Sequence, residues 1–391
     1  MISRVAVVRH DGKFYTDPLW ALDVNANSQE LGGLRLICPV HVADGVDAIR
    51  SGKLDPLDPL IEITGDDELS DDRLEALIEK VEVVELPGNF DWSRAALARR
   101  VLRIARRHGR LTILGISSNR VKTTLMNAQG KGFAGRLRAR LRAENIRRTQ
   151  RYLARRVDAV RVVGQGVARL VEDRAKTVNV EVASWIRSAD IEDPKPELHD
   201  PATVMIASRL EPMKGIRVGI DAAAEAIAGG TDIRLSIVGV GAEEARLRER
   251  VSDRGIDAQT EFTGQLAYPG PFFGAVHESD FVLLTNLNDE QPRLIFDAIS
   301  RGAIPICPRN TAYNDLGLDS RIFYEQGNAR SLADTLVNLI NAPIAVRMDI
   351  QLQLKQLART RTIESMHAQR ARWIRGLLGR EMIEEPKATA A

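Results

Sequence analysis

The chain has 391 residues, more than one hydrophobic core usually contains, so about two domains are expected. Hydrophobic residues make up 44% and charged residues 28%, as in globular proteins, and the net charge of +2 indicates no particular partner. The only cysteines, Cys38 and Cys307, exclude a disulfide framework and a cysteine zinc site, and no apolar run approaches the roughly eighteen residues of a membrane span. The amino terminus does not resemble a signal peptide, so we expect a cytoplasmic protein.

Short β-branched runs alternate with stretches of helical periodicity, which predicts βα units and parallel sheets. In the first half we expect strands at 4–9, 34–39, 81–86, 111–116, 159–163 and 179–183, and helices at 17–29, 92–107 and 135–156. In the second half we expect strands at 203–207, 234–238, 260–262, 281–284 and 304–307, and helices at 216–228, 243–254, 293–301 and 329–340.

A polar stretch with three prolines, 188–201, separates the halves and is typical of a linker. We therefore predict two domains, at 1–190 and 200–345. A long helical region at 346–380 is expected to pack back on the first domain. Two α/β halves that face each other leave a cleft, and such clefts commonly bind ligands.

Two cations follow the first strand of the second half. Arg209 and Lys214 lie in the segment ASRLEPMKG, which leaves the carboxyl end of that strand. In open parallel sheets this edge faces the ligand, and a forked guanidinium beside an ammonium suits two phosphates. The pair predicts a diphosphate site that works without a metal ion. For an isolated pair, two solvated loop residues are the alternative.

A polar segment with two acids follows the predicted strand 281–284. It contains Asp289 and Glu290, and the helix after it carries Arg293 and Asp297. The free N–H groups at a helix start bind anions, and a carboxylate on the first turns can accept hydrogen bonds from ribose hydroxyls. Both segments together predict a nucleotide-sugar site. The alternative is that the first two acids only cap the helix and that Asp297 is a surface residue.

The two segments resemble the carboxyl-terminal domain of retaining GT-B glycosyltransferases of the glycosyltransferase group 1 type, the family-four class. The family's RL…KG motif and its second acid with the following A…G.P pattern match Arg209, Leu210, Lys214, Gly215, Asp297, Ala298, Gly302 and Pro305. The family's first glutamate falls on Asp289 or Glu290. Aspartate thus replaces one or both family glutamates, and Pro292–Arg293 occupies the phosphate-facing turn. The resemblance covers residues 203–343 well and the first half weakly.

This resemblance implies an α/β protein of GT-B fold, with two Rossmann-like domains that face each other across a cleft. It implies a hexosyltransferase of polysaccharide biosynthesis that moves a sugar, with retention, from a nucleoside diphosphate sugar to a glycan or lipid-linked acceptor. No cofactor and no metal is implied. A catalytically silent GT-B-like binding or scaffold protein, and a GT-B epimerase or phosphorylase, are the other interpretations.

The resemblance also assigns roles to residues. Asp289 or Glu290 would contact the donor sugar, and Asp297 the ribose. Arg209 and Lys214 would hold the diphosphate, together with the backbone amides of Arg293 and Leu294. Gly241, in the strand and turn LSIVGVG, would lie near the nucleotide. The acceptor site is expected in the first domain, where Ser117, Ser118, Asn119 and Arg120 follow the strand 111–116.

The stretch 131–156 carries nine arginines against the single acid Glu144. A basic amphipathic helix can lie on anionic lipid, here at the inner face of the membrane, which would suit a lipid-linked acceptor. A solvated helix whose arginine stems cover apolar surface explains the same stretch equally well. Nucleic acid is not expected, because no recognition motif accompanies the arginines.

Overall fold

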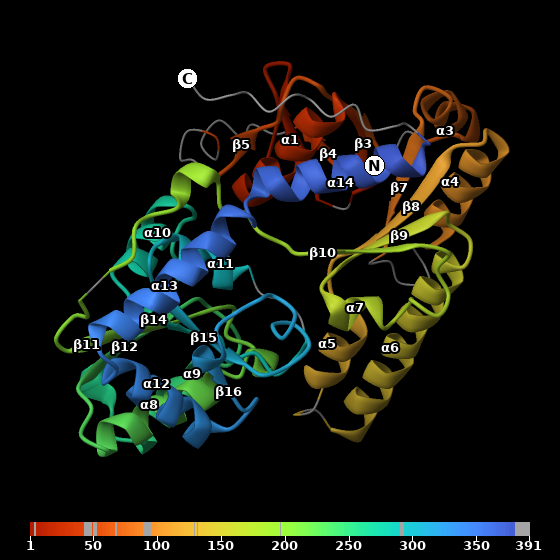
Figure 1. Ribbon diagram of the computed structural model, residues 1–391. Coiled ribbons are helices and arrows are strands. Elements are labelled where there is room, and N and C mark those ends of the chain that lie inside the picture. The colour runs from red at the N-terminus through yellow and green to blue at the C-terminus, as the bar shows by residue number, and fades with distance from the viewer. Residues whose placement is uncertain are drawn as a thin grey trace, which may run out of the picture.

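The computed structural model describes residues 1–379 apart from 4, 43–48, 50–52, 67–68, 89–94, 129, 131, 196 and 290–292. Two α/β units lie side by side, and the carboxyl-terminal helices cross from the second unit to the first (Figure 1). None of the helices in the described ranges combines the length and the hydrophobicity needed to cross a bilayer.

The second unit is a six-stranded parallel sheet in the order β13-β12-β11-β14-β15-β16. Its strands are β11 (Ala202–Ala207), β12 (Ile233–Val238), β13 (Thr260–Gly264), β14 (Phe281–Leu283), β15 (Ile304–Pro308) and β16 (Phe323–Tyr324). Its helices are α8 (Ile216–Ala228), α9 (Glu244–Asp253), α10 (Gly270–His277), α11 (Leu294–Ser300), α12 (Ala329–Ile340) and α13 (Ile344–Arg359). The five strands expected here agree with β11 to β15 within two residues.

The first unit is built around a parallel sheet in the order β10-β9-β8-β7. Its strands are β7 (Val83–Pro87), β8 (Leu111–Ile116), β9 (Ala159–Val163) and β10 (Val178–Glu181). Its helices are α3 (Asp71–Ile78), α4 (Ala95–Arg107), α5 (Arg120–Met126), α6 (Phe133–Ala154) and α7 (Gln165–Ala168). Ile2 connects this sheet to the pair β3 (Leu34–Cys38) and β6 (Ile61–Gly65), since it bridges Ile37 and donates to Glu85 O at 3.2 Å.

The amino-terminal part forms a further sheet in the order β4-β1-β2-β5, beside α1 (Pro18–Leu31). Its strands are β1 (Val7–His10), β2 (Lys13–Thr16), β4 (Val40–Val42) and β5 (Asp55–Pro56). We expected one strand at 4–9, but β1 and β2 form an antiparallel hairpin. Asp11 and Gly12 make its two-residue turn with φ of 47° and 74°, and Asp-Gly is a strong signal for such a turn.

The helical region expected at 346–380 is divided into two helices. α13 ends at Arg359, and α14 (Ile363–Leu377) begins after Thr362, whose side chain accepts a hydrogen bond from Ser365 N. α13 packs against α11, whereas α14 packs against α1 of the first unit. The chain therefore crosses between the units a second time near Thr360 (Figure 1).

Buried charges hold α14 on the first unit. Arg370 forms two hydrogen bonds with Glu181, at 2.9 and 2.7 Å, and both side chains are 5% exposed. Glu181 also pairs with Arg161 at 3.1 Å. His367 lies 3.1 Å from Asp23, and this contact together with the Arg370 charge lowers the pKa of Asp23 to about 2 against the effect of burial.

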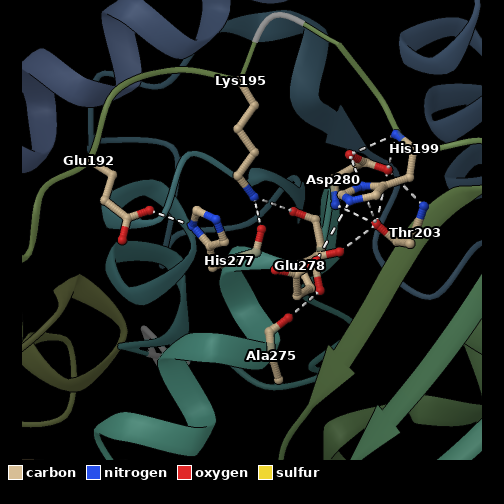
Figure 2. A network of polar contacts seen from close by, with 9 residues as sticks. Glu192, Lys195, His199, Thr203, Ala275, His277, Glu278 and Asp280 are labelled. Carbon is tan, nitrogen blue, oxygen red and sulfur yellow. Dashed lines mark hydrogen bonds and ion pairs between the residues drawn. The ribbon is translucent and has the colours of Figure 1, made fainter.

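The linker 188–201 lies fixed on the second unit by polar contacts (Figure 2). Glu192 accepts a hydrogen bond from His277 Nδ1 at 2.6 Å, and Lys195 Nζ donates to the carbonyl oxygens of His277 and Ser279. Near the linker's end, the Asp280 carboxylate contacts His199 Nδ1 at 2.9 Å. Hydrogen bonds and ion pairs thus hold this segment on the second unit, although it has few apolar side chains.

Candidate active site

The loop that carries Arg209 and Lys214, residues 208–215, leaves the carboxyl end of β11; we call it the cation loop. It is held against the loop that follows β12, where Leu210 N donates to Val240 O at 3.0 Å. A Cβ at Gly241 would lie 2.4 Å from the carbonyl oxygen of Leu210, so glycine allows this close approach. Gly241, expected near the nucleotide, thus packs on the backbone of the cation loop.

The two cations of this loop lie in different surroundings. The Arg209 side chain is 68% exposed, and its Nη1 donates to Glu211 Oε1 at 2.6 Å. Lys214 is half-buried at the end of a 3-10 turn, Pro212–Lys214. Gly215 follows with a φ of 63°, and a Cβ there would lie 2.2 Å from Thr285 O. The cation loop therefore packs directly on the segment that leaves β14.

That segment, residues 285–289, ends in the first predicted acid; we call it the acid loop. Thr285 Oγ1 donates to Lys214 O at 2.7 Å, and Leu287 N donates to Met213 O at 2.9 Å. These two hydrogen bonds tie the acid loop to the cation loop. The carboxyl ends of two neighbouring strands, β11 and β14, thus bring their polar loops to one edge of the sheet.

The interior of the acid loop is polar and buried. Tyr313 donates its hydroxyl hydrogen to Asn286 Oδ1 at 2.7 Å, and Asn286 Nδ2 donates to Asn288 O at 3.0 Å. Asn288 is fully buried, and its Nδ2 has no acceptor among the residues that the structure describes. An unsatisfied buried N–H group costs about 1–3 kcal/mol, so this amide lowers the stability of the acid loop.

Asp289 contacts the first unit. Its Oδ2 lies 2.8 Å from Lys122 Nζ of α5, and the two side chains are 31% and 35% exposed. Its backbone packs against Gly166 of α7, where a Cβ would lie 2.6 Å from Asp289 O. A glycine at 166 therefore permits the backbones of the two units to approach each other closely at this acid.

Asp297 lies on α11 and is only 6% exposed, so its interpretation as a surface residue is wrong. Burial raises the pKa of this carboxyl group to about 7, although the positive charge of Arg293 and a hydrogen bond from the Tyr268 hydroxyl oppose that effect. The Tyr268 oxygen lies 3.5 Å from Asp297 Oδ1. A carboxyl group with such a pKa can be neutral or charged near neutral pH.

Arg293 packs against the segment that follows β10. Its guanidinium carbon lies 3.1 Å from the centre of the Trp185 ring. The helix begins one residue later than expected, since Arg293 is its N-cap and Leu294, half-buried, its first residue. Glu290 and Pro292 lie outside the described residues, so their expected roles stay predictions.

The contacts gather the predicted residues into two groups. One contains the cation loop, the acid loop and Lys122, and the other contains Asp297, Arg293, Tyr268 and Trp185. The predictions missed Lys122, Glu211, Tyr268 and Trp185. Glu211 could have been found, because an acid two residues after Arg209 is within reach of its side chain. The other three are brought close only by the tertiary fold.

Residues 201–342 match the family model of glycosyl transferases group 1, and residues 96–261 match that of a family 4 glycosyltransferase in conflict systems. No curated protein matches the chain by sequence. Among solved structures, Anabaena HepE in complex with UDP superposes with a TM-score of 0.65 at 14% identity, over 96% of this chain and 100% of HepE. For HepE in complex with UDP-glucose the TM-score is 0.64 at 14% identity, over 96% and 99%.

Sucrose-phosphate synthase from Thermosynechococcus elongatus is similar to the same extent, with a TM-score of 0.64 at 11% identity over 97% of this chain and 98% of that one. At such low identity these likenesses give the fold, which is GT-B, as the sequence predicted. The match to the family model covers the second unit, residues 201–342. The chain is a glycosyltransferase of GT-B fold, and its residues 201–342 match the model of glycosyl transferases group 1.

Proposed function

We propose that the enzyme transfers a hexose from a nucleoside diphosphate sugar to a glycan or lipid-linked acceptor, with retention of the anomeric configuration. The observation that carries this proposal is the attachment of the cation loop to the acid loop, through Thr285 and Lys214 and through Leu287 and Met213. Two cations and a carboxylate thereby share one edge of the sheet. A diphosphate and its sugar need that combination of charges.

In the proposed reaction, Arg209 and Lys214 hold the diphosphate, and Asp289 contacts the sugar. Cations that bind the diphosphate more strongly as the glycosidic bond breaks lower the barrier. The acceptor oxygen forms the new bond on the face from which the diphosphate leaves, and the departing phosphate oxygen takes the acceptor proton. The protein side chains supply the charge in this scheme, so no metal or other cofactor is proposed.

The nucleotide is proposed to lie against α11, with Asp297 accepting hydrogen bonds from the ribose. Its burial beside Tyr268 and Arg293 supports a binding role, because a solitary buried carboxylate is costly unless it has partners. Backbone amides of Arg293 and Leu294 would contact the phosphates. UDP is the first nucleotide to test, because HepE is described in complex with UDP and with UDP-glucose.

We also propose that the enzyme works at the inner face of the cytoplasmic membrane, in polysaccharide assembly. Phe133, Leu137 and Leu141 on α6 are 77%, 46% and 65% exposed, and their spacing of four residues places them on one side of the helix. Leu125 of α5 adds a fourth side chain, 40% exposed. Arginines flank this apolar stripe, as on helices that bind anionic lipid.

Titration calorimetry with UDP and GDP, followed by a screen of sugar nucleotides for diphosphate release, tests the central proposal. We expect one nucleotide to bind and the matching sugar nucleotide to be hydrolysed slowly in the absence of an acceptor. Lys214→Ala should weaken binding of the diphosphate at least tenfold and leave binding of the free nucleoside unchanged. An unaltered diphosphate affinity in Lys214→Ala would refute the assignment of the cation loop.

A further inference from the structure

A second basic surface lies where α5 and α6 of the first unit face the cation loop of the second. It surrounds a cavity of about 720 Å³. The lining residues come from both units: Ser118, Arg120, Thr123, Thr124, Asn127, Ala128, Gly135, Arg138, Ala139, Arg142, Arg209, Glu211 and Met213. We call it the arginine cavity. The proposed donor site uses only Arg209 of this set.

Positive charge dominates the arginine cavity. Four of the lining side chains are arginines, and Glu211 is the only acid among them. Arg209 already pairs with Glu211 at 2.6 Å, so this acid does not neutralise Arg138 and Arg142 on α6. Arg138 and Arg142 form no ion pair within the part of the chain that the structure describes. Like charges placed together in this way are destabilising unless an anion joins them.

Nearer the carboxyl end of α6 the arginines are paired with acids, whereas no ion pair is formed by Arg136 or Arg140 among the described residues. Arg147 and Arg148 pair with Glu144 at 2.8 and 2.9 Å, and Arg151 pairs with Asp173 at 2.7 Å. The positive charge on the carboxyl-terminal half of α6 is thus partly neutralised by neighbouring acids. In the lining of the arginine cavity the acid is Glu211, and it already forms an ion pair with Arg209 of the second unit.

The geometry of α6 makes room for a ligand between the two free cations. Arg138 and Arg142 are one turn apart, and Gly135 and Ala139, the residues beside them in the lining, have no bulky side chain. Hydroxyl and amide groups at Ser118, Thr123 and Asn127 add hydrogen-bonding groups on the α5 side. Forked guanidinium groups with neighbouring hydroxyls are well suited to the oxygens of a phosphate.

We propose that the arginine cavity binds a phosphate group carried by the acceptor. This proposal rests on the proposed function, because Arg209 would lie between the donor diphosphate and the acceptor phosphate. The acceptor is then a phosphate ester, either a soluble one or the headgroup of a lipid. Its phosphate, bound by Arg138 and Arg142 on α6, keeps an acceptor hydroxyl beside the sugar at Asp289.

The test uses the full chain saturated with UDP, so that the donor diphosphate site is occupied. Two probes are titrated by calorimetry: glycerol phosphate and a short-chain, water-soluble phosphatidic acid. The variant is Arg138→Gln with Arg142→Gln. The control is Arg136→Gln with Arg140→Gln, which removes two exposed arginines of the same spacing from the same helix, outside the cavity lining.

We expect the wild type and the control to bind a probe alike, and the cavity variant to bind it at least tenfold more weakly. Tighter binding of phosphatidic acid than of glycerol phosphate assigns the group to a lipid, and equal binding assigns it to a soluble ester. No binding of either probe to the UDP-saturated wild type, equal affinities in wild type and cavity variant, or an equal loss in the control would overturn the proposal. UDP binding to the wild type, measured first, tests the proposed function separately.

Discussion

Lys122 of the first unit and Asp289 of the second form an ion pair of 2.8 Å between the two units. The acid expected to contact the donor sugar is therefore oriented by a cation that lies 167 positions away in the chain. Because both units contribute to the proposed site at Asp289, its geometry depends on the position of one unit relative to the other.

Replacing Lys122 with methionine should lower the turnover of the sugar nucleotide at least tenfold and change its affinity for UDP less than twofold. The reason is that Asp289 loses its positioning partner while the cation loop stays intact. The pair is partly exposed, so its loss should cost only about 1 kcal/mol or less of stability. Steady-state diphosphate release and calorimetry measure the two effects.

Lys176→Met is the matched control for that change, because Lys176 forms a comparable ion pair of 3.2 Å with Asp158 away from the acid loop. It should leave turnover unchanged. A Lys122→Met enzyme with normal turnover and weakened UDP binding would contradict the assignment and place Lys122 at the nucleotide instead.

Binding of a nucleotide should be coupled to the proton on Asp297. With a pKa of about 7, this carboxyl group is about half protonated at pH 7, and a carboxylate that accepts ribose hydrogen bonds must be charged. UDP binding should therefore release up to about half a proton at pH 7 and less at pH 8. Calorimetry in buffers of different ionisation enthalpy measures this release, and Asp297→Asn should abolish the part due to Asp297.

The raised pKa of Asp297 also makes the free energy of unfolding depend on pH. Its folded pKa lies above the unfolded value of 3.8, so the folded chain binds the proton more tightly between about pH 4 and pH 7. The free energy of unfolding should fall as the pH rises through that window, by at most about 4 kcal/mol. Asp297→Asn should flatten this part of the profile in thermal melts. A profile identical to that of the wild type would show that Asp297 is charged in the folded protein.

The apolar stripe on α6 gives a prediction about membranes. Leu137→Gln with Leu141→Gln should reduce sedimentation with vesicles that contain anionic lipid, because each side chain loses apolar surface that would enter the interface. High salt should also weaken binding, since the flanking arginines act through charge. Leu352→Gln on α13, another exposed leucine at 50%, is the control and should bind as the wild type does. Wild-type sedimentation that is absent, or insensitive to salt, would exclude this surface.

The strands of the second unit could be predicted well because each is a short, β-branched, buried run between polar loops. Ile304–Pro308 and Ala202–Ala207 are examples, and the loops after such strands carry Arg209, Lys214 and Asp289. The first unit was harder, because short strands such as β5, with two residues, have no detectable alternation. The Asp11–Gly12 hairpin was predictable from its dipeptide alone, but a single strand was expected there.

The environment of the site residues could not be read from the sequence. The stacking of Arg293 on Trp185 and the pairing of Lys122 with Asp289 join segments that are more than a hundred residues apart. Hydrophobic periodicity reports only which face of a local element is buried. The burial of Asp297 also depends on Tyr268, which reaches α11 from a different loop.

The last prediction concerns the carboxyl-terminal crossing. Arg370→Met leaves Glu181 with Arg161 as its remaining cation in a buried environment, and breaking such a buried pair typically costs about 3–5 kcal/mol. We expect a lower melting temperature and faster proteolysis between α13 and α14, because α14 loses its hold on the first unit. Arg372→Met, an exposed arginine on the same helix, should change neither. If both variants melt as the wild type does, the buried pair does not hold α14 on the first unit. In that case the apolar contacts between α14 and α1 are sufficient to hold it there.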